Sequence, residues 1–205
     1  RRLMPRTMLP GVSRETDEKL HQFEALVRKW NPAINLVSKA SIDFLWDRHI
    51  HDSAQICAHI RPTGRWVDLG SGGGFPGLII AILAHGANED LRLTLVESDQ
   101  RKAAFLRQVA RELSLEVSVL THRIETCPPQ SADVISARAL APLTTLLGFA
   151  SRHLAQSGTA IFPKGARWQQ EVEAARKDWH FDLQAHTSAT DPEGALLVVK
   201  AISHA

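Results

Sequence analysis

A glycine-rich run in the first half of the chain contains the residue types that most clearly suit ligand binding. Residues 68–77 read Asp-Leu-Gly-Ser-Gly-Gly-Gly-Phe-Pro-Gly, with five glycines within eight positions. The run joins two apolar stretches, which indicates a strand, a turn and a helix. Because glycine has no Cβ, the backbone of such a turn can lie against a bound molecule, and free N–H groups of the helix can point at it. The pattern therefore predicts a ligand-binding loop.

Two kinds of nucleotide ligand suit this loop. Gly72, Gly74 and Gly77 satisfy the dinucleotide pattern Gly-x-Gly-x-x-Gly, and Glu97 follows twenty residues later. S-adenosylmethionine is favoured, because Asp68 at the tip of the preceding strand suits a ligand with an ammonium group. The chain also contains no tyrosine, which excludes a dehydrogenase built on a Tyr/Lys pair. A turn that packs tightly and binds nothing is the third alternative.

The carboxyl ends of the predicted parallel strands should surround this cofactor. The residues around the glycine turn that we expect to contact its methionine portion are Asp68, Gly70, Gly72 and Gly74. Glu97 ends the next strand and can accept hydrogen bonds from both ribose hydroxyls. Ile124 and Glu125 follow the third strand and could bracket the adenine. Arg138 follows the fourth strand, where either the cofactor's carboxylate or an incoming nucleic acid should lie.

Several segments, taken together and in order, resemble the ribosomal RNA small subunit methyltransferase G family. They are residues 30–31, 35–38, 48–50, 52–53, 68–77, 96–107, 122–125, 136–139, 163–165 and 197–200. The resemblance implies methyl transfer from S-adenosyl-L-methionine to N7 of one guanine, G527, in the 16S rRNA of the small ribosomal subunit. It also implies cofactor contacts at Gly70, Phe75, Ile124, Glu125 and Arg138.

The residues that are missing agree with this chemistry. Guanine N7 is a lone-pair acceptor without a proton, so direct in-line transfer needs alignment but no general base. We therefore expect no catalytic residue. Methylation of an exocyclic amine usually employs an Asn/Asp-Pro-Pro-aromatic motif after the fourth strand, whereas residues 136–139 read Ser-Ala-Arg-Ala. Methylation at carbon 5 needs a cysteine nucleophile there, and Cys127 lies on an earlier loop.

Basic side chains near the predicted cleft are the candidates for substrate contacts. They are Arg48, His49, Arg123, Arg138, Lys164 and Lys200. Together they could steer a phosphate backbone, although each could equally be a solvated surface charge or part of a structural ion pair. We expect no metal site, because His49 and His51 would point away from each other on a helix. Asp52 is interpreted as an internal hydrogen-bond partner that stabilises the N-terminal helices against the sheet.

Two helices should precede the glycine turn. Ser13 should cap a helix that runs to Trp30 and stops at Asn31-Pro32. Ser41 should start a second helix, whose predicted buried residues are Phe44, Leu45, Ile50, Ile56, Cys57 and Ile60. We expect residues 1–62 to form a helical cap, with a basic lead-in at residues 1–12 that could touch phosphate. Residues 63–205 would then form the methyltransferase domain.

Beyond residue 62 the pattern alternates between strands and helices, which is typical of a parallel sheet covered on both faces. Strands are predicted at 65–69, 91–97, 117–120, 132–137, 158–163, 181–187 and 196–202, and helices at 77–85, after Asp99, after Pro142 and at 166–179. This predicts an α/β fold of the class I S-adenosylmethionine-dependent methyltransferase type, with a Rossmann-like seven-stranded sheet and an N-terminal helical extension. The order of the strands cannot be read from periodicity.

Composition limits the remaining choices. The chain has 205 residues and a net charge of +2, which permits an anionic partner. It lacks an apolar run of about 18 residues and has only two cysteines, so we expect a reduced cytoplasmic protein that does not enter a membrane. We also expect a monomer. Two alternatives stay open, namely a small-molecule methyltransferase and a catalytically silent cofactor-binding protein that docks on RNA.

Overall fold

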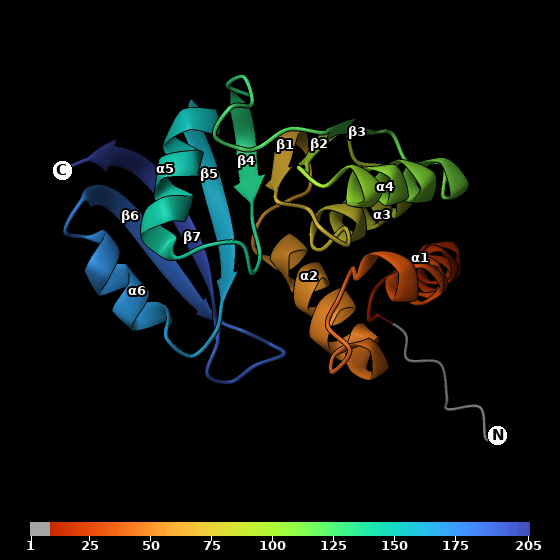
Figure 1. Cartoon of the computed structure of the whole chain (residues 1–205). Coiled ribbons are helices and arrows are strands. Elements are labelled where there is room, and N and C mark those ends of the chain that lie inside the picture. Colours follow the sequence, from red (N-terminus) through yellow and green to blue (C-terminus); the bar gives the residue numbers. More distant parts are fainter. Residues whose placement is uncertain (1–8) are drawn as a thin grey trace.

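A seven-stranded sheet organises the chain in this computed structural model, which describes residues 9–205. The strands are β1 (Gly64–Leu69), β2 (Leu91–Val96), β3 (Val117–Leu120), β4 (Ala132–Ser136), β5 (Leu154–Lys164), β6 (Trp179–Thr187) and β7 (Ala195–His204). Their order in the sheet is β3-β2-β1-β4-β5-β7-β6 (Figure 1). Strands β1 to β5 pair in parallel, and β7 is antiparallel to both β5 and β6. The predicted α/β fold of the class I methyltransferase type is confirmed.

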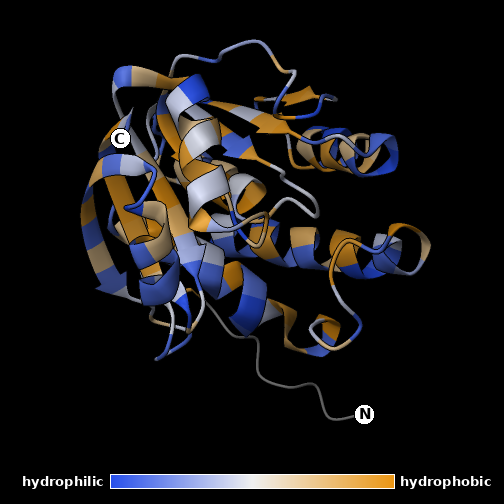
Figure 2. Ribbon diagram, turned by 60° about the vertical axis from the view of Figure 1, so that its left-hand side comes forward, coloured by the Kyte–Doolittle hydropathy of each residue, from blue (hydrophilic) through white to orange (hydrophobic). Residues whose placement is uncertain are grey.

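Helices cover both faces of the sheet. They are α1 (Arg14–Ile34), α2 (Asp52–Ala54), α3 (Gly77–Gly86), α4 (Gln100–Glu112), α5 (Leu143–His153) and α6 (Trp168–Ala175). One hydrophobic cluster joins α1, α3 and α4 to the face that contains Trp66, and a second joins α5 and α6 to the face that contains Val67. The residues of both clusters are buried, and Figure 2 shows that hydrophobic residues are frequent along the strands of the sheet. The side chains of neighbouring strand residues thus pack in the cores on opposite faces of the sheet, which is the alternation expected of a strand.

The first helix extends beyond its predicted end. Ser13 caps it as expected, since its side chain accepts a hydrogen bond from the Thr16 backbone N–H. The predicted stop at Asn31-Pro32 is wrong, because Pro32 lies inside the last turn and α1 ends at Ile34. A proline this close to the end removes only one helical hydrogen bond. Asn31 supports the turn that follows, since its Oδ1 accepts a hydrogen bond of 2.8 Å from the Val37 N–H.

The second predicted helix is a series of short turns. It comprises the 3-10 turn η1 (Ile42–Phe44), the π-helical turn η2 (Trp46–His51), α2 and the 3-10 turn η3 (Gln55–Ala58). Leu45, Ile50 and Ile56 are fully buried as expected. The prediction that Phe44 is buried is wrong, since 58% of this side chain is exposed. Each change of helix type rotates the side chains relative to a regular helix, so one apolar spacing cannot describe the whole segment.

Two differences and one agreement concern the second half of the fold. Helix α6 is shorter than the predicted 166–179, because Trp179 already pairs with β7 at the start of β6. Strand β5 begins four residues earlier than predicted, at Leu154. The connection between β3 and β4 contains turns and no helix.

Three further observations concern the N-terminal segment and the helices. Most of the predicted basic lead-in, residues 1–8, lies outside the described residues. Helix α1 shares a core with α3 and α4, so the N-terminal segment packs directly on the sheet-covering helices. Among residues 9–205, no helix combines the length and the apolar character needed to cross a membrane.

Candidate functional site

Two adjoining cavities lie at the carboxyl ends of the parallel strands. The first, which we name the glycine-loop cavity, has a volume of about 620 Å³ and is lined by the loop after β1, by Glu97 after β2 and by residues 122–125 after β3. The second, the Lys164 cavity, has about 740 Å³ and lies between β5, α5 and α6. Residues 138–141, after β4, line both cavities. The structure therefore brings together four loops that lie apart in the sequence.

The glycine turn has two different roles. Gly72 faces the glycine-loop cavity, and a Cβ built on it would lie no closer than 3.7 Å to any other atom. Gly74 does not line this cavity; its φ is +90°, and a Cβ there would lie 2.5 Å from Leu78 Cδ1. Gly74 is thus required by the packing of the loop on α3, whereas Gly72 leaves room for a ligand.

Glu97 ties the glycine turn to the start of α4. Its Oε2 accepts a hydrogen bond of 2.8 Å from the Gly72 N–H, and its Oε1 accepts one of 2.8 Å from the Asp99 N–H. Each carboxylate oxygen has two lone pairs, so one acceptor position remains on each oxygen. Glu97 lines the cavity, and these positions suit two neighbouring hydroxyl donors.

Asp68 lies behind the loop and lines neither cavity. Its Oδ1 accepts a hydrogen bond of 2.7 Å from the Ser136 hydroxyl, which in turn accepts one of 3.0 Å from Trp66 Nε1. Complete burial raises the pKa of Asp68 to about 6, and hydrogen bonds from Ser136, Ser71 and Gly77 oppose that rise. We therefore assign Asp68 the task of shaping the turn, and its contact with the ammonium group of a ligand stays a prediction.

Arg138 joins the sheet to the N-terminal segment. Its guanidinium donates to Asp52 Oδ2 at 3.2 Å, to the Arg48 carbonyl at 3.2 Å and to His49 Nδ1 at 2.6 Å. The guanidinium also lies over the Phe75 ring, 5.4 Å from its centroid. Because Arg138 can only donate, His49 Nδ1 must be the unprotonated nitrogen. Burial and the neighbouring Arg138 lower the pKa of His49 to about 4.

Asp52 extends this network to the loop between β6 and β7. Its Oδ1 accepts hydrogen bonds from Gln55 Nε2 at 2.9 Å and from the Thr190 hydroxyl at 2.8 Å. Gln55 Oε1 also accepts a bond of 2.8 Å from the Ala189 N–H. Asp52 is thus the internal hydrogen-bond partner that the sequence suggested, and it connects Arg138 to the rim of the Lys164 cavity.

The other predicted contact residues differ in burial and in their distance from the cavities. Ile124 is buried in the wall of the glycine-loop cavity, where its carbonyl lies 3.0 Å from His153 Nε2. Glu125 and Arg123 are exposed at the edge of this cavity, where Arg123 Nε lies 3.8 Å from Glu125 Oε2. Lys200 lies on β7 opposite Asp182 and lines neither of the two cavities. Arg48 is exposed and contributes its carbonyl to the Arg138 network.

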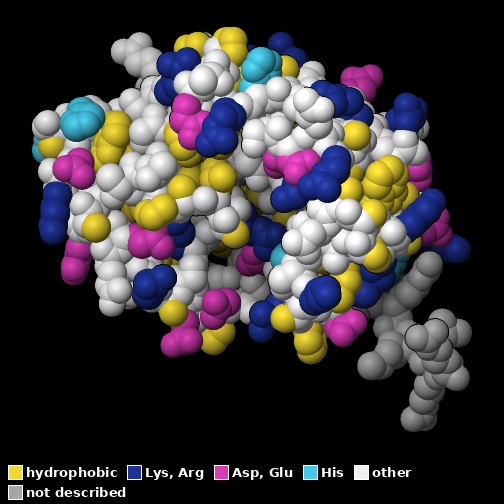
Figure 3. Space-filling model, viewed as in Figure 1, with side chains coloured by type: hydrophobic (Ala, Val, Ile, Leu, Met, Phe, Trp, Pro, Cys, Tyr) yellow, Lys and Arg dark blue, Asp and Glu magenta, His cyan; other side chains and the backbone are white. Residues whose placement is uncertain are grey.

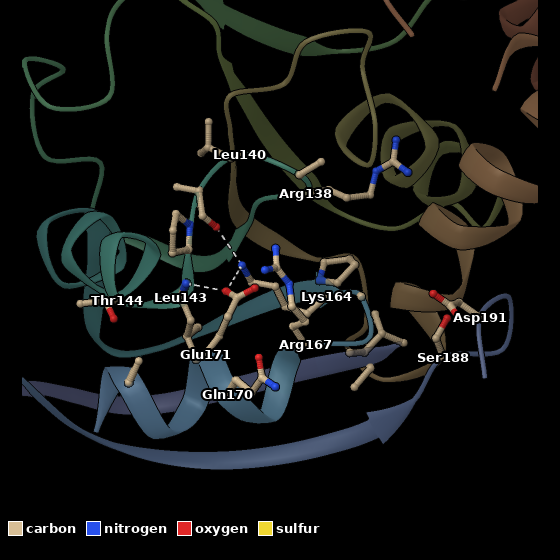
Figure 4. Close-up of a pocket in the computed structure, with 18 of the residues that line it drawn as sticks. Arg138, Leu140, Leu143, Thr144, Lys164, Arg167, Gln170, Glu171, Ser188 and Asp191 are labelled. Carbon is tan, nitrogen blue, oxygen red and sulfur yellow. Dashed lines mark hydrogen bonds and ion pairs between the residues drawn. The ribbon is translucent and has the colours of Figure 1, made fainter. Parts of the chain in front are cut away.

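Lys164 is the central polar residue of the second cavity and is not a free surface charge. Its Nζ donates to the Ala141 carbonyl at 2.8 Å and to Glu171 Oε2 at 2.6 Å (Figure 4). Only 10% of its side chain is exposed. Arg167, Gln170 and Glu171 reach the same cavity from the start of α6. The hollow in the middle of the face shown in Figure 3 corresponds to this part of the molecule, with basic and acidic side chains around it.

Sequence reasoning missed part of the lining. The additional residues around the glycine-loop cavity include Leu36, Val37, Ser98, Lys102, His122, Leu140 and Phe149. Ser98 and Lys102 directly follow the β2 end, so their position after a predicted strand was an available signal. Leu36 and Val37 arrive from the segment after α1, and only the tertiary fold brings them there. Within residues 9–205, no group of histidine, cysteine and acidic side chains could hold a metal ion.

The glycine-loop cavity has the properties that S-adenosylmethionine requires. It combines a glycine turn open to a ligand, a carboxylate with free acceptor positions and apolar walls from Ile124 and Phe75. Two buried donors beside it, Arg138 Nε and His49 Nε2, have no hydrogen-bond partner among the described residues. A buried donor without a hydrogen-bond partner costs free energy, and a ligand carboxylate could accept a hydrogen bond from each of these two donors.

Comparison with known proteins shows which family the chain resembles. The family described as "GidB: rRNA small subunit methyltransferase G" matches residues 16–195. The chain is 55% identical over 191 residues to the ribosomal RNA small subunit methyltransferase G of Ruegeria sp. (strain TM1040), covering 93% of both chains. It is 52% identical over 201 residues to the protein of that name from Ruegeria pomeroyi, covering 98% of both chains.

A solved structure supports the fold independently. A methyltransferase from Geobacter sulfurreducens matches with a TM-score of 0.58 at 15% identity, covering 97% of this chain and 93% of that chain. The family match spans far more than half of the chain. The cofactor of this protein is S-adenosyl-L-methionine, and the chain belongs to the rRNA small subunit methyltransferase G family.

Proposed function

We propose that this protein transfers a methyl group from S-adenosyl-L-methionine to N7 of one guanine, G527, of 16S rRNA. The observation that supports the proposal best is the pair of cavities that share residues 138–141. One cavity suits the cofactor, and the other is open beside it for a base. The relatives with about half of their residues identical are named for methylation of small-subunit ribosomal RNA.

The chain's own residues would hold the cofactor in an ordered way. Gly70, Gly72 and Phe75 would face its methionine portion, and Glu97 would accept from the ribose hydroxyls. Ile124 and Glu125 would flank the adenine. Arg138 and His49 have unpaired donors for the carboxylate. When bound, S-adenosylmethionine supplies an electrophilic methyl group on a sulfonium sulfur.

The transfer itself needs little from the protein beyond alignment. Guanine N7 has a lone pair and no proton, so no group has to remove a proton before attack. Residues 138–141, which line both cavities, would position the base against the methyl donor. Holding two reactants in line can lower a barrier by about 7–11 kcal/mol, which is enough to explain catalysis without a general base.

Basic side chains around the two cavities would attract the RNA backbone. Lys102 and Arg123 line the glycine-loop cavity, and Arg167 lines the Lys164 cavity. Arg123 and Arg167 are exposed, as is Arg48, whose carbonyl accepts a hydrogen bond from Arg138. Each phosphate contact made by such a side chain releases counterions, so RNA binding should weaken steeply with salt. A methyltransferase for an uncharged small metabolite would not need this distribution.

A single labelling experiment tests the proposal. The protein is incubated with labelled S-adenosylmethionine and with small-subunit RNA or particles that lack the modification, and N7 methylation is mapped by chemical cleavage of the strand. We expect one labelled guanine, at position 527, and no label in RNA that has an adenosine there. Labelling of a small metabolite but not of RNA would favour the first alternative. Tight binding of cofactor and RNA without any transfer would favour a silent docking protein.

A further inference from the structure

The Lys164 cavity contains a carboxylate that is only partly used by the protein. Glu171 lies on α6, and 30% of its side chain is exposed to the cavity. Its Oε2 accepts two hydrogen bonds, one of 2.8 Å from the Leu143 N–H and one of 2.6 Å from Lys164 Nζ (Figure 4). Its Oε1 receives no hydrogen bond from any described residue. Both lone pairs of Oε1 are therefore available to a ligand.

The partners of Oε2 hold this carboxylate in place. Leu143 is the first residue of α5, so its N–H is one of the helix donors that have no partner within the helix. Lys164 ends β5 and is itself bonded to the Ala141 carbonyl in the wall shared by the two cavities. Glu171 is thus fixed relative to that wall, and an acceptor fixed in this way can select among ligands.

Guanine is the base that matches such an acceptor. Its N1–H and N2–H₂ donors are neighbours and point in the same direction. Adenine places an acceptor nitrogen beside its amine, and cytosine and uracil offer no pair of adjacent donors. Flipped or unstacked bases are commonly recognised by this edge. Guanine N7 lies on a different edge of the ring system, across from N2, and can therefore face the glycine-loop cavity while the donor edge is bound.

We infer that Glu171 is a specificity-determining residue that binds the N1–H and N2–H₂ donors of the target guanine in the Lys164 cavity. The inference rests on the proposed function, because it assigns a recognition site to the base that would be methylated. Arg167, exposed at the entrance of the same cavity, is positioned to meet the phosphate of the extruded nucleotide.

An inosine substitution tests this assignment, because inosine keeps N7 and N1–H but lacks the N2 amine. The kcat/KM for methylation is measured on small-subunit RNA with either guanosine or inosine at the target position. The wild-type protein should prefer guanosine by roughly tenfold to a hundredfold, the effect of one hydrogen bond to a charged group. Glu171→Gln should reduce the preference to within about threefold.

Two controls separate recognition from folding. Glu173→Gln makes the same change of charge on the same helix, at an exposed position outside the cavity, and should keep the full preference. Calorimetric affinity for S-adenosylmethionine should be the same in all three proteins, which a collapsed α6 would not allow. Equilibrium binding of the two RNAs, measured by fluorescence anisotropy, gives the preference even for a variant with slow turnover.

The outcomes distinguish this inference from the proposed function. A Glu171→Gln variant with the full guanosine preference would overturn the inference, as would a wild-type protein that methylates N7 of guanosine and inosine equally well. In both cases the proposed function would survive. If the wild-type protein methylates no guanine N7 in this RNA, the proposed function fails and the assignment of Glu171 fails with it.

Discussion

Replacement of Asp52 by alanine should remove the ion pair with Arg138 that connects the N-terminal segment to the loop after β4. Asp52 accepts hydrogen bonds from Arg138, Gln55 and Thr190, and its side chain and that of Arg138 are only 18% and 15% exposed. Without Asp52, the guanidinium of Arg138 stays buried and charged, and it keeps only the Arg48 carbonyl and His49 as acceptors.

The expected loss of stability follows from that geometry. Removal of one partner of a buried ion pair costs about 3–5 kcal/mol, mainly because the other charge is left uncompensated. The partial exposure of the Asp52–Arg138 pair and the two remaining acceptors place the expected loss at about 2–4 kcal/mol. For a chain of this length, the melting temperature should fall by about 4–16 °C. Urea unfolding followed by circular dichroism measures the free energy directly.

A matched variant and a double variant make the test strict. Asp47→Ala removes a carboxylate five residues earlier whose side chain is 73% exposed, and it should change stability by less than about 0.5 kcal/mol. Arg138→Met in the Asp52→Ala background removes the stranded charge and should recover part of the lost stability. The reasoning is refuted if Asp52→Ala is as stable as Asp47→Ala, or if Arg138→Met lowers the stability of Asp52→Ala further.

Three other predictions concern the glycine-loop cavity. Glu97→Gln should weaken S-adenosylmethionine binding at least tenfold in calorimetry. The glutamine amide has one oxygen and one NH₂ group, so only one of the two positions can still accept hydrogen bonds. Gly74→Ala should lower the free energy of unfolding by about 1–3 kcal/mol, because its new Cβ would lie 2.5 Å from Leu78 Cδ1 and φ is +90°. Burial and the charge of Arg138 lower the pKa of folded His49 to about 4, so the unfolded chain binds more protons between pH 6.5 and 4. Stability should therefore fall as the pH drops through that interval, and His49→Gln should remove this part of the pH dependence.

Each of these predictions has a result that would contradict it. Unchanged cofactor affinity in Glu97→Gln would remove the ribose assignment. A Gly74→Ala protein that unfolds at the wild-type urea concentration would mean that the loop adjusts freely. For His49, the comparison of variant with wild type matters, because Asp68, whose pKa is raised to about 6, changes stability in the opposite direction in both proteins. Parallel pH profiles for the two proteins would contradict the assignment to His49.

Local signals in the sequence were sufficient to predict the strand, turn and helix that border the glycine-loop cavity. The apolar stretches on either side of the glycines predicted β1 and α3 to within one residue, because both elements are almost wholly buried and the turn contains glycines. Glu97 was located by its position at the end of a strand. The order of the strands, and hence the neighbourhood of β4 and β5, depends on long-range pairing and could not be obtained in this way.

The failures have equally physical reasons. The Asn31-Pro32 stop was wrong because a proline in a last turn loses a single hydrogen bond, which a local rule overestimates. The partners of Arg138 could not be predicted as a set, since Asp52 and His49 lie 86 and 89 residues away in the sequence. The pairing of Lys164 with Glu171 was also missed, although only seven positions separate the end of β5 from this residue of α6. Periodicity describes which face is apolar but does not say which polar groups meet.

The interior position of β7 in the sheet has a consequence for folding during synthesis on the ribosome. Of the seven described strands, β7 is made last, yet it lies between β5 and β6, and β6 has no other neighbour in the sheet. Its first residues, Ala195 and Leu196, also complete the wall of the Lys164 cavity. A nascent chain that ends before residue 195 therefore lacks part of the wall of the Lys164 cavity, even though the glycine turn at residues 70–77 has long been made. If the Lys164 cavity takes the target base, as we propose, methylation requires that nearly all of the polypeptide has been released for folding.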